Sequence, residues 1–194
     1  MNDSIKLCKI KKSFGINPVI DDLSCSFPKG ETSALLGISG RGKTTLMRIL
    51  MGLEKADSGE ILGLDGLRPS AVFQENRLCE NLSAVSNIRL VNPSLTRGEV
   101  LREMEKVGLC GCADQSVCSL SGGMKRRVAL LRAIMADWDI LFLDEPFEGL
   151  DSETRKKTIA YVRSRTRGKT VLIVTHVPQE LEMLGCREEN TIRL

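Results

Sequence analysis

The residues that point most directly to chemistry form a glycine-rich stretch that fits the phosphate-binding pattern G-x-x-x-x-G-K-[ST], Gly37-Ile38-Ser39-Gly40-Arg41-Gly42-Lys43-Thr44-Thr45. Its three glycines have no Cβ, so the backbone can turn tightly and come close to a ligand. The successive N–H groups then form an anion-binding concavity at the start of a helix. Lys43 can reach the β- and γ-phosphates of a nucleotide, and the Thr44 hydroxyl can bind Mg²⁺. The stretch therefore predicts a nucleotide site.

Two carboxylates follow an apolar segment further along the chain. Residues 139–143 are typical of a buried strand, and Asp144 and Glu145 come directly after it. Carboxylates at a strand end beside a phosphate site are suited to binding Mg²⁺ and to activating water. The alternative for Glu145 is a purely structural carboxylate. Its position next to Asp144, downstream of the glycine-rich stretch, favours catalysis.

Three further features carry possible chemistry. Ser121, Gly122 and Gly123 precede a helical segment, which repeats the serine, glycine and helix-start arrangement of an anion site. His176, the only histidine, follows an apolar strand-like segment, at the edge where α/β folds bind ligands; a histidine that only packs at this edge is the alternative. Phe14 lies in a polar stretch, 12–15, that we expect to be a turn. Its ring can stack on adenine or cover the edge of the core, and both interpretations stay open.

The elements that must position these residues alternate between strands and helices. The apolar patterns predict strands at 5–9, 19–27, 32–36, 60–62, 70–74, 139–143, 170–174 and 190–194. They predict helices at 46–51, 83–91, 98–107, 124–134, 152–164 and 178–184, with Gly108 as a stop and Ser152 as an N-cap. We expect an α/β fold with a mostly parallel core sheet, an N-terminal antiparallel β layer and an inserted helical lobe. The core and β layer comprise 1–74 and 138–194, and the helical lobe comprises 75–137.

Composition narrows the class of protein. The chain has 194 residues, 42% hydrophobic residues and a net charge of +3, which is typical of one globular domain. Its basic residues are scattered among acidic ones, so we expect no nucleic-acid partner. No apolar N-terminal region and no run of 18 apolar residues is present, so we expect neither a signal peptide nor a membrane span.

The seven cysteines are expected to be free thiols. The spacing of Cys110, Cys112 and Cys118 lacks zinc-type pairs.

The order of the motifs resembles the ATP-binding cassette (ABC) family. The matching motifs are the glycine-rich loop, Gln74, Leu120-Ser121-Gly122-Gly123, Asp144-Glu145, Asp151 and His176. The resemblance covers essentially the whole chain, and six separated motifs are far more specific than the loop alone, which kinases, GTPases and helicases share. The segment from Val72 to Leu78 and on to Asn87-Ile88 looks like transporter cassettes, among them the nitrate/sulfonate/taurine and thiamine-precursor importers.

The resemblance implies a role for each matching residue. Phe14 would stack on adenine, and Gly37 and the residues from Ser39 to Thr45 (Ser39, Gly40, Arg41, Gly42, Lys43, Thr44, Thr45) would hold the phosphates. Thr44, Gln74 and Asp144 would bind Mg²⁺, while Gln74 would also touch the attacking water. Glu145 would orient or deprotonate that water, and His176 would be the switch histidine. Ser121, Gly122 and Gly123 would bind ATP held by a second copy, and Asp151 would lie in the loop that crosses the dimer interface.

For the whole protein, the resemblance implies a P-loop NTPase that hydrolyses ATP with Mg²⁺ in a head-to-tail dimer. Its partners would be membrane permease subunits and an extracytoplasmic substrate-binding protein. We therefore expect a cytoplasmic, peripheral location on the inner face of the membrane. Departures from the family pattern are Met124 in place of the usual glutamine, Phe14 in place of the commoner tyrosine, and an end at Leu194, before the helices that most importer cassettes add.

The alternative function is a soluble cassette ATPase that acts on nucleic acid, the ribosome or an assembly process. Chromosome-maintenance cassettes carry a long coiled coil between the residues that match Lys43 and Ser121, which are too close here. Ribosome-associated cassettes usually carry two cassettes in one chain, and this chain has one. An assembly or signalling module without transport stays open at the level of sequence.

Overall fold

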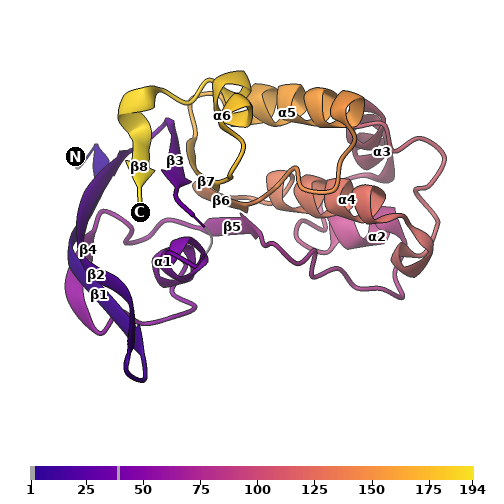
Figure 1. Cartoon of the computed structure of the whole chain (residues 1–194). Coiled ribbons are helices and arrows are strands. Elements are labelled where there is room, and N and C mark those ends of the chain that lie inside the picture. Colours follow the sequence, from indigo (N-terminus) through magenta and orange to yellow (C-terminus); the bar gives the residue numbers. More distant parts are fainter. Residues whose placement is uncertain (1–2, 39) are drawn as a thin grey trace.

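The computed structural model describes residues 3–38 and 40–194, which form two sheets and flanking helices (Figure 1). The antiparallel sheet has the order β2-β1-β4, with β1 (Ser4–Phe14), β2 (Asn17–Pro28) and β4 (Ser58–Leu62). The parallel sheet has the order β5-β6-β7-β3-β8, with β3 (Thr32–Leu36), β5 (Pro69–Val72), β6 (Ile140–Asp144), β7 (Thr170–Val174) and β8 (Thr191–Arg193). The predicted parallel core sheet and antiparallel β layer are both confirmed.

The helices cover the two faces of the parallel sheet differently. Figure 1 shows α5 and α6 on one face, α1 and the antiparallel sheet on the other, and α2 and α3 at the far end of the molecule. Their bounds are α1 (Lys43–Leu50), α2 (Ala84–Arg89), α3 (Arg97–Lys106), α4 (Gly122–Ile134), α5 (Ser152–Thr166) and α6 (Pro178–Leu184). Short 3₁₀ helices lie between α3 and α4, at Val117–Ser119, and between α6 and β8, at Glu188–Asn190. No helix in the part of the chain that the structure describes is long and apolar enough to cross a membrane.

The hydrophobic core consists of two clusters separated by the parallel sheet. Alternate residues of a strand point to opposite faces, so each central strand contributes to both clusters. Leu141 and Leu143 of β6 belong to the cluster beneath α2 to α6, while Ile140 and Phe142 belong to the cluster beneath α1 and the antiparallel sheet. This burial on both faces explains why β6 and β7 are continuous apolar runs.

Parallel pairing places the functional segments at one edge of the sheet. Strand β6 pairs with β5 and β7, and β7 pairs with β3, all in parallel. The carboxyl ends of these four strands therefore meet at the same edge, which is where open α/β sheets bind ligands. The glycine-rich loop follows β3, Gln74 follows β5, Glu145 follows β6 and His176 follows β7.

The first hairpin is longer than the sequence pattern indicated. The predicted turn at 12–15 is wrong, because β1 continues to Phe14 and the turn lies at Gly15 and Ile16. Lys12 is only 9% exposed, since its ammonium forms ion pairs with Glu54 at 3.0 Å and Asp57 at 3.3 Å. These partners are distant in sequence, so a lysine that looked typical of a turn is part of a strand.

Helix caps agree with the predictions at one helix and differ at another. Helix α3 ends before Gly108, which has a φ of 71° and stops the helix as predicted. Helix α5 begins at Ser152, but its N-cap is Asp151, whose carboxylate accepts from the N–H groups of Glu153 and Thr154. The prediction that Ser152 caps this helix is therefore wrong by one residue.

Candidate nucleotide-binding site

A cleft of about 360 Å³ opens at the edge where the parallel strands end. Its lining residues are Phe14, Val19, Gly40, Gly42, Lys43, Thr44, Thr45, Gln74, Asp144, Glu145 and Val174. The structure thus brings together eight of the residues predicted to bind nucleotide or metal, from segments far apart in the sequence. A larger groove of about 610 Å³, lined by residues from Gly30 to Thr32 and from Arg163 to Arg187, lies at the opposite ends of β3 and β7 and shares no lining residue with this cleft.

The glycine-rich loop approaches neighbouring backbone at two glycines. Gly42 has a φ of 81° and forms the N-cap of α1, and a Cβ there would lie 2.8 Å from the carbonyl oxygen of Val19. A Cβ at Gly37 would lie 2.6 Å from the carbonyl oxygen of Leu194. No larger residue fits either position without a backbone shift. Ser39, the predicted phosphate ligand, lies outside the described residues.

Lys43 points back into its own loop. Its Nζ donates hydrogen bonds to the carbonyl oxygens of Gly37 at 2.7 Å and Ile38 at 2.9 Å. The ammonium therefore lies inside the curve of the loop, together with the N-terminal amides of α1. Positive charge and backbone donors converge there, which is the arrangement that binds phosphate oxygens.

Thr44 and Asp144 supply oxygen atoms at the floor of the cleft. The Thr44 hydroxyl donates to Oδ2 of Asp144 at 2.9 Å. Asp144 is 4% exposed. Burial raises its pKa above the ordinary value, while the hydrogen bond from Thr44 opposes this shift. Hydroxyl and carboxylate oxygens suit Mg²⁺, which proteins commonly hold through one or two carboxylates together with substrate phosphates. Among the described residues no group of three or more histidine, cysteine or acidic side chains could hold a metal. The Thr44 hydroxyl and the Asp144 carboxylate fit Mg²⁺ that is bound together with a nucleotide.

Glu145 and His176 meet at the mouth of the cleft. Nδ1 of His176 lies 3.0 Å from Oε2 of Glu145, although His176 itself is largely exposed. The hydrogen bond and the negative charge of Glu145 raise the pKa of His176 above 6.5. Glu145 also has a φ of 46°, a left-handed backbone conformation that is unfavourable for a residue with a Cβ. Such strain is found where the surrounding structure imposes it, often at functional sites.

The other predicted residues lie away from the cleft. Ser121 is the N-cap of α4 and accepts from the N–H of Met124 at 3.3 Å. Ser121 and Gly122 are exposed, while Asp151 is an exposed cap of α5. Arg41 is exposed and lines a neighbouring groove with Val19 and Leu194. The second glycine-rich stretch therefore presents its helix start to the outside of the molecule rather than to this cleft.

Comparison with known proteins decides the family. A model described as ABC transporter matches residues 20–148, which is more than half of the chain. The chain belongs to the ABC transporter family. Membership of this family explains both the order of the sequence motifs and the fold around the cleft.

Individual relatives of this ABC cassette agree. It is 39% identical over 198 residues to the sulfate/thiosulfate import ATP-binding protein CysA of Escherichia coli K12, covering 91% of this chain and 54% of CysA. It is 40% identical to the aliphatic sulfonates import ATP-binding protein SsuB 1 of Nocardia farcinica, covering 95% of this chain and 76% of that protein. The chain thus spans about half the length of CysA. The resemblance to importer cassettes of the sulfonate type is confirmed.

A solved structure supports the fold independently. The ABC cassette superposes on MJ0796, a bacterial ABC transporter cassette solved as a dimer, with a TM-score of 0.82. The two chains are 26% identical, and the match covers 92% of this chain and 90% of that one. The predicted α/β P-loop fold is therefore confirmed.

Sequence reasoning missed one buried residue beside the ABC cleft. Arg126 is 4% exposed and contacts the segments that carry Gln74 and Glu145. In the sequence it stands in the basic run Lys125-Arg126-Arg127, which is typical of a solvated helix face. Its place on the helix that follows Gly123 is the only sequence feature that links it to the site. That place does not show whether its side chain lies on the buried or the exposed face of the helix.

Proposed function

We propose that this chain binds and hydrolyses ATP with Mg²⁺, and that two copies act together to drive a separate membrane permease that imports its substrate. The observation that carries the proposal is the single cleft that joins Lys43, Thr44, Asp144 and Glu145. Phosphate-binding amides, oxygen ligands and a carboxylate suited to activate water lie together at one edge of the sheet. Membership of the ABC transporter family and the names of the importer relatives give the chemistry its context.

Nucleotide binding would rest on residues at the two ends of the cleft. Phe14 is half-exposed beside the glycine-rich loop and would stack on the adenine. The loop amides from Gly37 to Thr45, including those of Ser39, Gly40, Arg41 and Gly42, would hold the phosphates, with Lys43 neutralising their charge. Thr44, Gln74 and Asp144 would hold Mg²⁺, which neutralises charge on the β- and γ-phosphates when it is bound.

Hydrolysis would depend on how Glu145 holds water against the terminal phosphate. Its carboxylate lines the cleft and accepts a hydrogen bond from His176 when Nδ1 is protonated. This contact fixes the orientation of the carboxylate that orients the water or accepts its proton. Charge that develops on the transferred phosphoryl group would be stabilised by Lys43 and by the amides of the loop.

A second copy would complete the site. Ser121, Gly122 and Gly123 start α4, a helix of 13 residues, and Ser121 and Gly122 face outward rather than into the cleft of their own chain. In a head-to-tail dimer they would approach the γ-phosphate bound by the partner, with Asp151 near the interface. The dimeric structure of the related cassette MJ0796 supports a self-associating cassette.

We propose that the chain lies on the inner face of the membrane through its permease, with an extracytoplasmic protein that delivers the substrate. The segment 75–137 would form a helical lobe inserted between the parts of the core and β layer, 1–74 and 138–194. The relatives' names concern sulfate, thiosulfate and aliphatic sulfonates. A sulfur oxyanion is accordingly the first class of substrate to test.

The catalytic part is tested with the purified chain and its Glu145→Gln variant. Removal of a general base typically slows a reaction by about 10²–10⁴-fold. We therefore expect the variant to bind ATP as the wild type does, to lose turnover, and to form dimers in light scattering when ATP and Mg²⁺ are present. Turnover within a few-fold of the wild type would contradict the role of Glu145.

The transport part needs a permease. A candidate two-subunit permease that binds the chain is reconstituted in vesicles, and ATP turnover is measured with and without it. We expect the permease to stimulate turnover of the wild type and not of Glu145→Gln. An unchanged rate with a permease that binds the chain would favour the assembly or signalling alternative.

A further inference from the structure

Arg126 lies at the junction of three functional segments. It is on α4, five residues after Ser121, and its side chain is directed between the segment after β5 and the segment after β6. We propose that Arg126 is a positioning residue for hydrolysis, which holds the backbone of Glu145 and Gln74 and ties both to the helix that carries Ser121. This proposal rests on the proposed ATPase function.

The guanidinium donates to acceptors from both segments. Nη2 donates to the carbonyl oxygens of Asp144 and Glu145, both at 2.6 Å. Nε donates to the carbonyl oxygen of Pro146 at 3.1 Å. The remaining acceptors, all bound by Nη1, are the carbonyl oxygens of Phe73 and Gln74 and Oδ1 of Asn76.

These contacts use the geometry that is special to arginine. A guanidinium presents its N–H donors in a rigid planar fork and has no acceptor. One side of this fork faces residues 144–146 and the other faces residues 73–76. A lysine has a single ammonium and cannot hold both backbone segments in the same fixed relation. The buried charge is compensated by carbonyl oxygens and by the nearby acidic residues Asp144, Glu145 and Glu148.

The contacts act on the backbone that is under strain. Glu145 has a φ of 46°, and the carbonyl oxygens before and after this torsion angle both accept from Nη2 of Arg126. On the other side, the N–H of Glu145 donates to the carbonyl oxygen of Val174 at 2.9 Å. Without Arg126 the backbone of Glu145 keeps two contacts, its N–H to Val174 and its carbonyl oxygen with the N–H of Glu148 at 3.2 Å, while the carbonyl oxygen of Asp144 loses its guanidinium donor. With fewer contacts on both sides of the strained torsion angle, the peptide can relax and turn the carboxylate away from the cleft.

The same helix connects these contacts to the second glycine-rich stretch. Ser121 caps α4, and Arg126 follows within the next two turns. Arg132, further along α4, donates to the carbonyl oxygens of Asn76 and Arg77. A shift of α4 relative to the sheet therefore moves the backbone around Gln74 and Glu145 with it. Arrival of a partner at Ser121 would in this way be sensed at the hydrolytic carboxylate.

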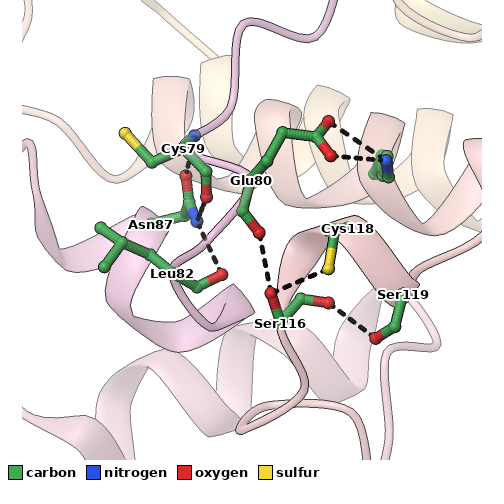
Figure 2. A network of polar contacts seen from close by, with 8 residues as sticks. Cys79, Glu80, Leu82, Asn87, Ser116, Cys118 and Ser119 are labelled. Atoms are coloured by element: carbon green, nitrogen blue, oxygen red, sulfur yellow. Dashed lines mark hydrogen bonds and ion pairs between the residues drawn. The ribbon is translucent and has the colours of Figure 1, made fainter.

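Lys125 provides a matched control. It precedes Arg126 on the same helix, its ammonium forms an ion pair with Glu80 at 3.2 Å, and neither residue lines the cleft. Figure 2 shows the Glu80 carboxylate directed toward α4, away from the Ser116 contact made by its own carbonyl. Lys125→Gln removes one positive charge next to Arg126 without changing the contacts to residues 73–76 and 144–146.

The experiment compares Arg126→Gln, Arg126→Lys and Lys125→Gln with the wild type. For each purified chain we measure the Kd of a fluorescent ATP analogue, the kcat of phosphate release normalised to the nucleotide-binding fraction, and the Tm. A small displacement of a catalytic group can cost on the order of 10²-fold in rate, so we expect a loss of this order in kcat for Arg126→Gln. We expect a smaller loss for Arg126→Lys, with Kd within about threefold of the wild type in both. Lys125→Gln should retain both values.

Two outcomes would overturn the proposal. One is a kcat for Arg126→Gln that equals that of Lys125→Gln; the other is a loss of nucleotide affinity in parallel with the loss of turnover. If Arg126→Gln does not fold, Asn76→Ala replaces it as the test, because this variant removes one acceptor of the guanidinium and leaves the charge of Arg126 in place. A reduced kcat with an unchanged Kd would support the proposal. An unchanged kcat would contradict it. Failure of the ATPase function itself is distinct, since the wild type would then show no turnover that depends on Glu145.

Discussion

Nδ1 of His176, which follows β7, lies 3.0 Å from Oε2 of Glu145, which follows β6. The two strands are neighbours in the parallel sheet, so the contact joins side chains from adjacent strand ends. The hydrogen bond and the charge of the carboxylate raise the pKa of His176. The pKa of the imidazole therefore depends on whether the proposed catalytic carboxylate is charged and in contact with it.

The first prediction concerns this pKa. His176 is the only histidine in the chain, so an NMR titration follows one imidazole without assignment. We expect a pKa above 6.5 in the wild type and a lower value in Glu145→Gln, because the variant removes the negative charge that favours the imidazolium. Glu182→Gln, on the exposed side of α6, should leave the titration unchanged. Equal pKa values in the wild type and Glu145→Gln would show that the contact is not formed in solution.

The second prediction concerns the proposed Mg²⁺ ligands. Thr44→Ala removes the hydroxyl that contacts Asp144, whereas Thr44→Ser keeps it. We expect Thr44→Ala to need on the order of tenfold more Mg²⁺ for half-maximal ATP turnover, the loss that is common when a metal site is weakened. Thr44→Ser should stay close to the wild type, and EDTA should stop turnover in all three. The same Mg²⁺ requirement in both variants would exclude the hydroxyl as a ligand.

The sequence allowed the edge of the sheet to be predicted because each motif is a short local signal. The apolar runs that precede Asp144 and Thr175 are typical of buried parallel strands, and parallel strands in one sheet have their carboxyl ends at the same edge. From this alone the loop before Lys43, the carboxylates and His176 were expected at one edge. The structure has them there, and the contact between Thr44 and Asp144 spans 100 residues of sequence.

Other features depend on partners that local sequence does not reveal. Lys12 is buried in a strand only because Glu54 and Asp57 neutralise it. Arg126 is buried only because α4 packs with that face toward the segments after β5 and β6. Spacing and polarity alone predict that a basic residue in either position is exposed to solvent. Long-range pairing decides these cases, and one sequence contains no signal for it.

The third prediction concerns Asn87, a fully buried residue of α2. Its amide accepts from the N–H of Cys79 and donates to the carbonyl oxygens of Cys79, Leu82 and Ser83. Figure 2 shows this amide directed at the backbone between Cys79 and Leu82. Asn87→Ala leaves the N–H of Cys79 without its partner, at a cost of about 1–3 kcal/mol for one unsatisfied group, while the three carbonyl oxygens keep backbone donors. We expect the free energy of unfolding in urea to fall by an amount in this range.

Ser119 supplies the control for that measurement. Its hydroxyl donates to the carbonyl oxygen of Ser116 in the same network, but Ser119 is exposed, so water can replace it (Figure 2). We expect Ser119→Ala to change the free energy of unfolding by less than about 0.5 kcal/mol, as is usual for surface substitutions. Equal losses in the two variants would mean that the burial of Asn87 has no energetic consequence.

The fourth prediction follows from a buried carboxyl group behind His176. Glu180 is 4% exposed, and Oε2 accepts from the hydroxyl of Thr175 at 2.6 Å. Burial raises its pKa above 4.5, against the opposing effects of Thr175 and Arg155. A carboxyl group with a raised pKa binds its proton more tightly in the folded chain than in the unfolded one. Its contribution to stability is thus present below the unfolded pKa and is lost as pH rises through the folded pKa.

Glu180→Gln removes that titration while the amide oxygen can still accept from Thr175. We expect the free energy of unfolding of the variant, relative to the wild type, to increase as pH rises above 4.5 and to level off once pH passes the raised pKa of Glu180 in the folded chain. Urea titrations at several pH values measure this difference directly. Glu182→Gln, exposed on the same helix, should show a difference that does not vary with pH. The difference for Glu180→Gln can also turn out not to vary with pH. In that case Arg155, whose Nε lies 3.8 Å from Oε1 of Glu180, stabilises the carboxylate as much as burial destabilises it.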